Sequence, residues 1–360
     1  MRKEMPTRAI CLILLAALFL SLGACKKKGS DAPLTPGLST IEGEPVHDDG
    51  VAVRTDNYTV TPGMMAYFFY TYGVTCLAAM NETVPYDKTK TLHEQMYTET
   101  LSFYDAIMNE TLDRVTRMLI CCEAARAEGA LLTDEEKSAV EQSITGYRVT
   151  AAVNYDKTLA DYLKATYGPL MGEDDLRAVL ELETLANRFS RTVSARLEGK
   201  ITPEQALAYA GEHGLADATP SRNIEYLFLP FEGGAAPEEK IAEATEAMRR
   251  APTSETLRGL SRLGTVGAEA DMTPDNAGIG EIGNWLFAAD RRVGDWGRVD
   301  LSGATYILLY TGNGASFGEV SARMRLFDAA YAAWREEWVK TLTFGYNYDC
   351  LDGYDVAERK

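Results

Sequence analysis

The spacing of apolar residues changes near residue 223, and this change limits the chain to a fold that combines helices with a small sheet. Up to about residue 215 apolar residues recur every three or four positions, as in residues 173–198, which is typical of amphipathic helices. Beyond residue 223 the sequence IEYLFL predicts a strand, and residues 304–310 (ATYILLY) predict a second, central strand. We therefore expect an α+β protein, mainly α, with a small α/β module inserted between helical segments.

Capping residues predict where several helices begin. Thr61 precedes Pro62, Thr133 opens a capping box with Glu136, and Thr202 precedes Pro203. Periodicity and these caps predict further helices at residues 105–128, 173–198, 237–250, 254–263, about 285–287, and 316 to about 342. Residues 265–280 contain Gly, Asp and Pro and predict a loop, and the C-terminal tail is expected to be extended.

Residues 64–80 (MMAYFFYTYGVTCLAAM) carry no charge, so a membrane span has to be considered for them. Their Tyr, Thr and Gly residues make a poor span. We interpret the segment as a buried or partner-facing helix.

The first 24 residues have the pattern of an export signal. Arg2, Lys3 and Arg8 precede an apolar run at residues 9–22 that is too short for a permanent span. The sequence Leu22-Gly23-Ala24-Cys25 resembles the lipobox of bacterial lipoproteins, in which the cysteine is diacylated and the chain is cut ahead of it. An ordinary secretory signal cut nearby is the alternative. The resemblance implies an extracytoplasmic protein held on the bacterial cell membrane through diacylglyceryl-Cys25, since two acyl chains anchor stably.

The chain is strongly acidic, which excludes binding of nucleic acid through a basic surface. The first 24 residues contain three basic residues and one acidic residue. Without them the chain has 33 Lys and Arg against 52 Asp and Glu, which is a net charge of −19. The remaining cysteines, Cys76, Cys121, Cys122 and Cys350, form neither a disulfide framework nor a metal motif, so no cofactor is expected. Cys121 and Cys122 are interpreted as buried apolar positions on a helix, with a redox pair as the alternative.

Residues 285–310, WLFAADRRVGDWGRVDLSGATYILLY, are similar to the parvulin stretch in which an apolar helix, a Gly-Asp turn and two strands follow one another. Over residues 57–342 the chain resembles the parvulin-type foldases of the SurA and PrsA kind, although its helical part matches only in pattern. The resemblance implies a helical chaperone domain, a parvulin-like module, and a C-terminal helix that packs back on the chaperone domain. The expected segments are a signal peptide at 1–24, a flexible tether at 25–56, the chaperone domain at 57–220, the module at 221–313, and the C-terminal helix and tail at 314–360.

Parvulins carry one histidine on the first strand and one on the last, facing each other under the prolyl peptide. At those positions we place Asn223 and Tyr306, and the module contains no histidine. The resemblance therefore implies a chaperone with little or no peptidyl-prolyl isomerase activity. The alternatives are an active isomerase with an altered site or, from another class, a solute-binding lipoprotein of an importer, which would show repeated βα units.

Aromatic and Met-rich segments suggest where an unfolded polypeptide could bind, because rings offer a large area and thioethers adapt their shape. Residues 58–104 are rich in both. The candidate peptide-binding residues are Tyr67, Phe68, Phe69, Tyr72, Trp285 and Phe287. The alternative is that these side chains form the protein's own core. The expected partners are newly exported, unfolded polypeptides.

Overall fold

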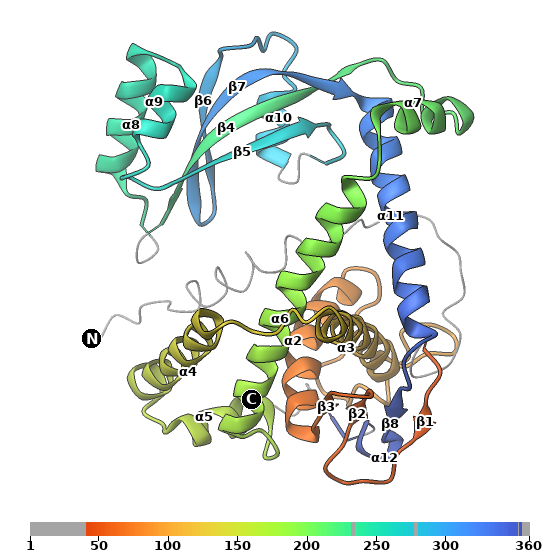
Figure 1. Cartoon of the computed structure of the whole chain (residues 1–360). Helices are drawn as coiled ribbons and strands as arrows, with labels where there is room; N and C mark the ends of the chain where they lie inside the picture. The colour runs from red at the N-terminus through yellow and green to blue at the C-terminus, as the bar shows by residue number, and fades with distance from the viewer. Residues whose placement is uncertain (1–40, 232–234, 277–279, 352, 355–360) are drawn as a thin grey trace. The chain divides into compact units, whose positions relative to one another are not determined.

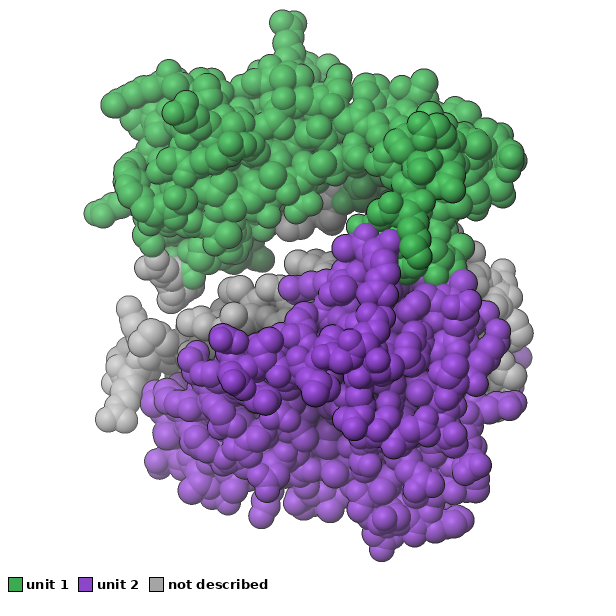
Figure 2. Space-filling model, viewed as in Figure 1, with its two compact units in different colours: residues 1–24, 197–330 green, residues 25–196, 331–360 purple. Residues whose placement is uncertain are grey.

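The computed structural model describes residues 41–231, 235–276, 280–351 and 353–354 (Figure 1). The export signal, Cys25 and the first part of the expected tether lie outside the described residues. The described residues divide into two compact units, coloured separately in Figure 2: those within 197–330 form unit 1, and those within 41–196 and 331–354 form unit 2. These boundaries differ from the sequence-based ones, because unit 1 also takes up the helix before the module and the first part of the helix after it.

Unit 2 is built mainly from helices, of which those after Thr61 and Thr133 begin where the capping residues predict. The helix predicted at 105–128 begins two residues earlier, at Phe103, after a cap at Ser102 that was not predicted. The side chains of Thr61, Ser102 and Thr133 each accept a hydrogen bond from the backbone N–H three residues later. The helices are α2 (Pro62–Asn81), α3 (Phe103–Ala127), α4 (Asp134–Tyr155), α5 (Leu159–Tyr167) and α6 (Glu173–Glu198). The uncharged stretch forms α2, which packs against α3. Among the helices in the described part of the chain, none combines the length and apolarity needed to cross a bilayer.

A small sheet joins the two ends of unit 2. Its strands are β1 (Glu44–Pro45), β2 (Val53–Arg54), β3 (Thr59–Val60) and β8 (Gly345–Tyr346), in the order β1-β8-β2-β3. The short helix α12 (Tyr348–Leu351) follows β8.

Part of the segment expected to be a flexible tether is therefore packed. Ala52 and Val53 are fully buried, which polar composition alone did not indicate. The buried Glu123 carboxylate holds the next turn by accepting hydrogen bonds from the Thr55 hydroxyl at 2.6 Å and from the Asn57 backbone N–H at 2.8 Å.

Unit 1 contains a four-stranded antiparallel sheet. Its strands are β4 (Pro220–Pro230), β5 (Thr265–Met272), β6 (Trp296–Leu301) and β7 (Ala304–Ser316), in the order β5-β4-β7-β6. The other elements of unit 1 are α7 (Pro203–Glu212), α8 (Glu238–Arg250), α9 (Ser254–Gly259), α10 (Gly280–Leu286) and the first part of α11 (Phe317–Val339). The predicted fold class, α+β and mainly α, is confirmed by this combination.

The prediction of a loop over residues 265–280 is wrong for its first eight residues. The predicted loop at 265–280 begins with β5, which pairs with β4 from Thr265 to Met272. Its sequence, TVGAEADM, lacks the bulky alternation that marks a half-buried strand, because five of its eight side chains are Gly, Ala or acidic. Pairing with β4 outweighs this weak local preference.

Candidate functional site

Alternation along β4 and β7 divides the sheet of unit 1 into two different faces. Leu227, Leu229 and Ile307 point to one face and are buried under α8 and α9. Ile224 and Leu308 point to the other, where Ile282 and Leu286 of α10 cover them. Because α10 is only seven residues long, part of the second face is left open.

Three aromatic side chains occupy the open part of that second face. The ring of Tyr306 lies between those of Tyr226 and Phe228, with centroids 5.7 Å and 5.2 Å away. All three are partly exposed. We refer to Tyr226, Phe228 and Tyr306 as the aromatic face.

Strand register fixes these rings beside each other. Phe228 stands directly opposite Tyr306, and Tyr226 stands opposite Leu308. On its other side Tyr226 pairs with Gly267 of the edge strand β5. A Cβ atom at position 267 would lie 2.4 Å from the Tyr226 hydroxyl oxygen, so the ring extends over the glycine toward the edge of the sheet.

The two phenols of the aromatic face remain protonated at neutral pH. Burial is the larger cause of the raised pKa of Tyr226, and the negative charge of the Glu269 carboxylate raises it further. Burial is likewise the larger cause of the raised pKa of Tyr306, and the neighbouring Tyr226 phenol raises it further. Both hydroxyls can therefore donate hydrogen bonds to a peptide carbonyl while the rings offer apolar contact.

The structure does not bring the expected pair, Asn223 and Tyr306, together. Asn223 pairs with Gly312, six residues along β7 from Tyr306, which corresponds to roughly 20 Å of strand. Its amide is engaged structurally: Oδ1 accepts from the Asp271 backbone N–H at 2.8 Å, and Nδ2 donates to the Asn313 carbonyl at 3.3 Å. On the face of Tyr306, Phe228 of β4 stands directly opposite it and Tyr226 lies two residues further along β4, and sequence reasoning missed both.

Two of the proposed peptide-binding residues, Trp285 and Phe287, pack against the same apolar cluster of the sheet as Tyr226 and Tyr306. Trp285 of α10 is partly exposed and stacks on the Arg291 guanidinium, 4.3 Å from the ring centroid. Phe287, also partly exposed, lies 5.3 Å from the Arg222 guanidinium and packs edge-on against Phe317. The Trp285 ring lies over Gly297 of β6, on the side of the sheet that carries the aromatic face, and Phe287 contributes to the contacts that hold α10 on the sheet.

The other four proposed peptide-binding residues are in the core of unit 2. Tyr67, Phe68, Phe69 and Tyr72 on α2 are all buried, with exposed fractions of 8% or less. Phe69 lies against Tyr104 and Tyr354, with centroids 5.4 Å and 5.6 Å away. In this conformation these rings stabilise the helical unit and do not reach a ligand, as the alternative interpretation of the aromatic segment expected.

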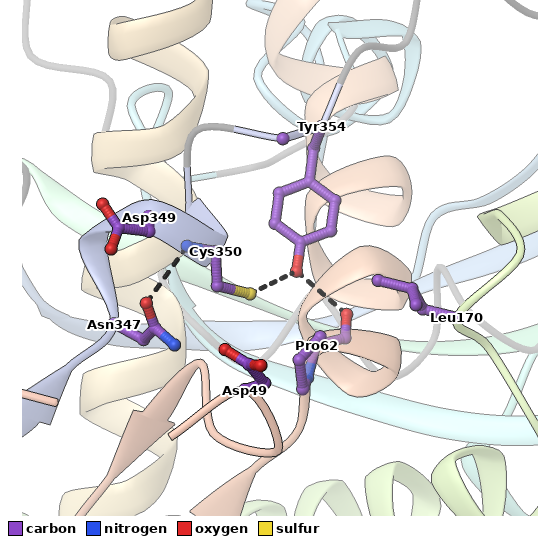
Figure 3. Close-up of a pocket in the computed structure, with 8 residues that line it drawn as sticks. Asp49, Pro62, Leu170, Asn347, Asp349, Cys350 and Tyr354 are labelled. Carbon is purple, nitrogen blue, oxygen red and sulfur yellow. Dashed lines mark hydrogen bonds between the residues drawn. The ribbon is translucent and has the colours of Figure 1, made fainter. Parts of the chain in front are cut away.

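A cavity of about 300 Å³ opens in unit 2 and is a weaker candidate site (Figure 3). Across it the Tyr354 hydroxyl donates to the Pro62 carbonyl at 3.0 Å and lies 3.3 Å from the Cys350 sulfur (Figure 3). Burial raises the pKa of Cys350, so its thiol is protonated at neutral pH and a poor nucleophile. These contacts hold the tail of the chain in place.

Within the described ranges, no three His, Cys, Asp or Glu side chains are grouped as a metal site would require. His93 and His213 stack on Tyr104 and Tyr209, with ring centroids 3.8 Å apart in each case. Cys121 and Cys122 are buried on α3. Cys25, the proposed lipid attachment site, lies outside the described residues.

Comparison with known proteins finds similar solved structures but no matching family model or curated protein. Among solved structures, the chain is similar to PrsA from Bacillus subtilis, with 13% identity over 71% of this chain and 92% of that one and a TM-score of 0.33. It is also similar to the foldase PrsA from Streptococcus pneumoniae, with 14% identity, 62% and 77% coverage and a TM-score of 0.22.

A third similar structure is the foldase PrsA from Lactococcus lactis, with 9% identity, 82% and 90% coverage and a TM-score of 0.23. Because the TM-scores are below 0.5, these structures assign no role to any residue of this chain.

Proposed function

We propose that this chain is a lipid-anchored, extracytoplasmic chaperone of the foldase kind, which binds newly exported, unfolded polypeptides. The observation that carries the proposal is the aromatic face of unit 1. It presents three partly exposed rings, two of which carry protonated hydroxyls, beside a sheet edge that is open at Gly267. Such a surface suits extended chains of varied sequence, because rings supply area and phenols supply hydrogen bonds to any backbone.

The proposed location of the protein in the cell is argued from the sequence alone. The export signal and the lipobox at Cys25 support a location on the outer face of a bacterial cell membrane, where exported chains emerge unfolded. The strong negative charge of the body keeps complexes with such chains soluble. We propose the module at 221–313 as the peptide-binding part and the helical segment at 57–220 as its support.

We further propose that the module has little or no isomerase activity. Prolyl isomerisation requires a site that binds the twisted amide better than the planar one, across a barrier of about 18–20 kcal/mol. The phenols of Tyr226 and Tyr306 stand where they can hold a peptide, but the module lacks the histidine pair of the parvulins.

Suppression of aggregation tests the main proposal. Full-length protein at a stoichiometric ratio should keep a reduced, unfolded exported protein in solution, as measured by light scattering. The double variant Tyr226→Ala, Tyr306→Ala should lose most of this effect. Val153→Ala is the matched control, because Val153 is apolar and 75% exposed but lies on α4 of unit 2. If the wild-type chain leaves the aggregation unchanged, the proposed chaperone function is wrong.

An active isomerase with an altered site is the alternative, and a protease-coupled assay with an Xaa-Pro peptide decides it. A catalysed rate that disappears in Tyr306→Phe would establish catalysis through that hydroxyl. The solute-binding alternative finds no support in unit 2, where α3 to α6 follow one another without an intervening strand among the described residues.

A further inference from the structure

The free edge of β5 is the strongest unassigned feature of unit 1. In the order β5-β4-β7-β6, β5 has a partner on one side only among the described residues. Ala268, Glu269 and Ala270 are exposed along it. A free edge presents a row of backbone N–H and C=O groups to which another extended chain can bind, and proteins usually block it with Lys, Pro or a covering element. The sequence of β5, TVGAEADM, contains neither Lys nor Pro.

The direction of these backbone groups follows from bonds elsewhere in the sheet. The Phe231 N–H donates to the Gly303 carbonyl at 2.9 Å, and the Tyr310 N–H turns away from β4 to the Asp295 carbonyl at 2.9 Å. Along each strand the backbone N–H and C=O groups of successive residues point to alternate sides. Counting along β7 and β4 from these bonds, the groups of Tyr226 point toward β5, and those of Gly267, which stands opposite Tyr226, point toward β4. The N–H and C=O groups of Val266, Ala268 and Ala270 consequently point outward.

The side chains at this edge are also arranged for a ligand. Gly267 and Glu269 stand opposite Tyr226 and Ile224, so both belong to the side of the sheet that carries the aromatic face. The glycine leaves the Tyr226 ring accessible from the edge. Glu269 is exposed and, among the described residues, forms no salt bridge, so it can pair with a cation.

We propose that β5 binds a segment of an unfolded polypeptide as an added strand, in which an apolar side chain contacts Tyr226 and a basic side chain two residues away contacts Glu269. The two-residue spacing follows from the side-chain period of a strand. Backbone hydrogen bonds supply affinity for any sequence, and the pair of side chains supplies the preference. This inference rests on the proposed chaperone function and specifies how its ligand is held.

The probe is a fluorescent eight-residue peptide in which Phe and Lys stand two positions apart in a background of Thr, titrated into full-length protein by anisotropy. Ala268→Pro removes one outward N–H and leaves the bonds to β4 intact, so we expect affinity to fall about tenfold or more. Arg298→Pro is the matched control, because it places proline at an outward position of the other edge strand, β6. It should bind the peptide within about twofold of wild type.

Charge exchange tests the preference. Glu269→Lys should reverse the selectivity, so that a peptide with Glu in place of Lys binds about tenfold better than the original. Amide hydrogen exchange gives a readout independent of variants: on peptide binding the amides of Ala268 and Ala270 should gain protection, whereas that of Gly267, already directed to β4, should not.

The outcomes separate the inference from the proposed function. If Tyr226→Ala abolishes binding but Ala268→Pro does not, the peptide lies across the aromatic face without adding a strand, and the inference fails while the function survives. If the chain dimerises and Ala268→Pro makes it monomeric without changing peptide affinity, the edge binds a second copy and the inference fails. If neither the peptide nor any unfolded protein binds, the proposed function fails as well.

Discussion

The ring of Tyr226 lies directly over Gly267, the residue that pairs with it on the edge strand β5. A Cβ atom at position 267 would stand 2.4 Å from both Cζ and the hydroxyl oxygen of Tyr226. Real contacts of this kind do not occur, so any side chain at 267 has to displace the ring. The glycine therefore determines where the Tyr226 side chain of the aromatic face is placed.

Gly267→Ala should change binding more than stability. The displaced atoms are the far end of a side chain that is only partly buried, so we expect the free energy of unfolding to change by less than about 1 kcal/mol. Loss of the Tyr226 position should weaken binding of an unfolded peptide by about fivefold or more. Fluorescence anisotropy and urea unfolding measure the two effects separately.

Gly303→Ala is the control for this variant. Gly303 lies in the same sheet, in the turn between β6 and β7, and a Cβ there would meet no atom within 4 Å. It should bind the peptide as wild type does. Equal losses in Gly267→Ala and Gly303→Ala would show that the glycine does not act through Tyr226.

The thiols of the described residues should react slowly in the folded protein. Burial raises the pKa of Cys76 and of Cys121 to about 11, and that of Cys122 further above its usual value, so none is appreciably ionised at pH 7.5. Iodoacetamide should label them only after denaturation, as mapped by peptide mass spectrometry. An added exposed thiol, Ser143→Cys on α4, should react rapidly in the same sample. Rapid labelling of Cys121 or Cys122 in native protein would instead support the redox-pair interpretation.

The helices were predictable because their signals are local. Thr133 and Glu136 make the reciprocal hydrogen bonds of a capping box within four residues, and α4 begins between them as expected. The burial of Cys121 and Cys122 likewise follows from the apolar spacing along α3.

The predictions that were wrong concern features that depend on pairing between segments far apart in the sequence. β5 is a strand because β4 lies beside it, not because its own residues favour one. The residues that lie beside Tyr306 depend on the register between β4 and β7, which places Phe228 opposite Tyr306 and Asn223 opposite Gly312. The sequence of one strand does not contain this register, so a position near the start of β4 was selected instead of Tyr226 or Phe228. One sequence signal could have found Tyr226: it alternates with Phe228 along one face of a strand.

Asp271→Ala should destabilise unit 1. Asp271 adopts a left-handed conformation with φ of 53°, and its Oδ1 accepts hydrogen bonds from the Ala315 N–H at 2.7 Å and from the buried Ser221 hydroxyl at 3.0 Å. Removing the carboxylate leaves both donors without this acceptor, which costs about 2 kcal/mol. Faster hydrogen exchange at the Ala315 amide, together with a lower urea midpoint, would report the loss.

Asp271→Asn separates the acceptor from the charge. Asn tolerates the left-handed region and keeps an oxygen for Ala315 and Ser221, but it weakens the contact with Arg323 at 3.3 Å. We expect it to retain most of the stability lost in Asp271→Ala. An equally large loss in both variants would assign the effect to the charge pair instead.

The stability of unit 2 should fall as pH rises from about 4.5 to 7 because of one carboxyl, that of Glu183 on α6. Burial raises its pKa from 4.5 to about 7, although a hydrogen bond with Tyr72 opposes the shift. The folded state therefore binds more protons than the unfolded state in this window, so this contribution is complete below pH 4.5 and is lost as pH passes 7. A pKa shift of this size corresponds to a change of about 3 kcal/mol in the free energy of unfolding. Because the Glu183 side chain is partly in contact with solvent, we expect a change of ~2 kcal/mol.

Glu183→Gln should remove this pH dependence, because an amide does not titrate. Urea unfolding at pH 5, 6 and 7.5 measures it as the difference between wild type and variant, in which the other carboxyls cancel. The variant should be closer to wild type at pH 5, where Glu183 is protonated, and the more stable of the two at pH 7.5. Glu181→Gln, on the same helix, serves as the control and should leave the wild-type slope in place. A Glu183→Gln profile parallel to that of wild type would mean that Glu183 is ionised throughout, with water rather than protein around its carboxylate.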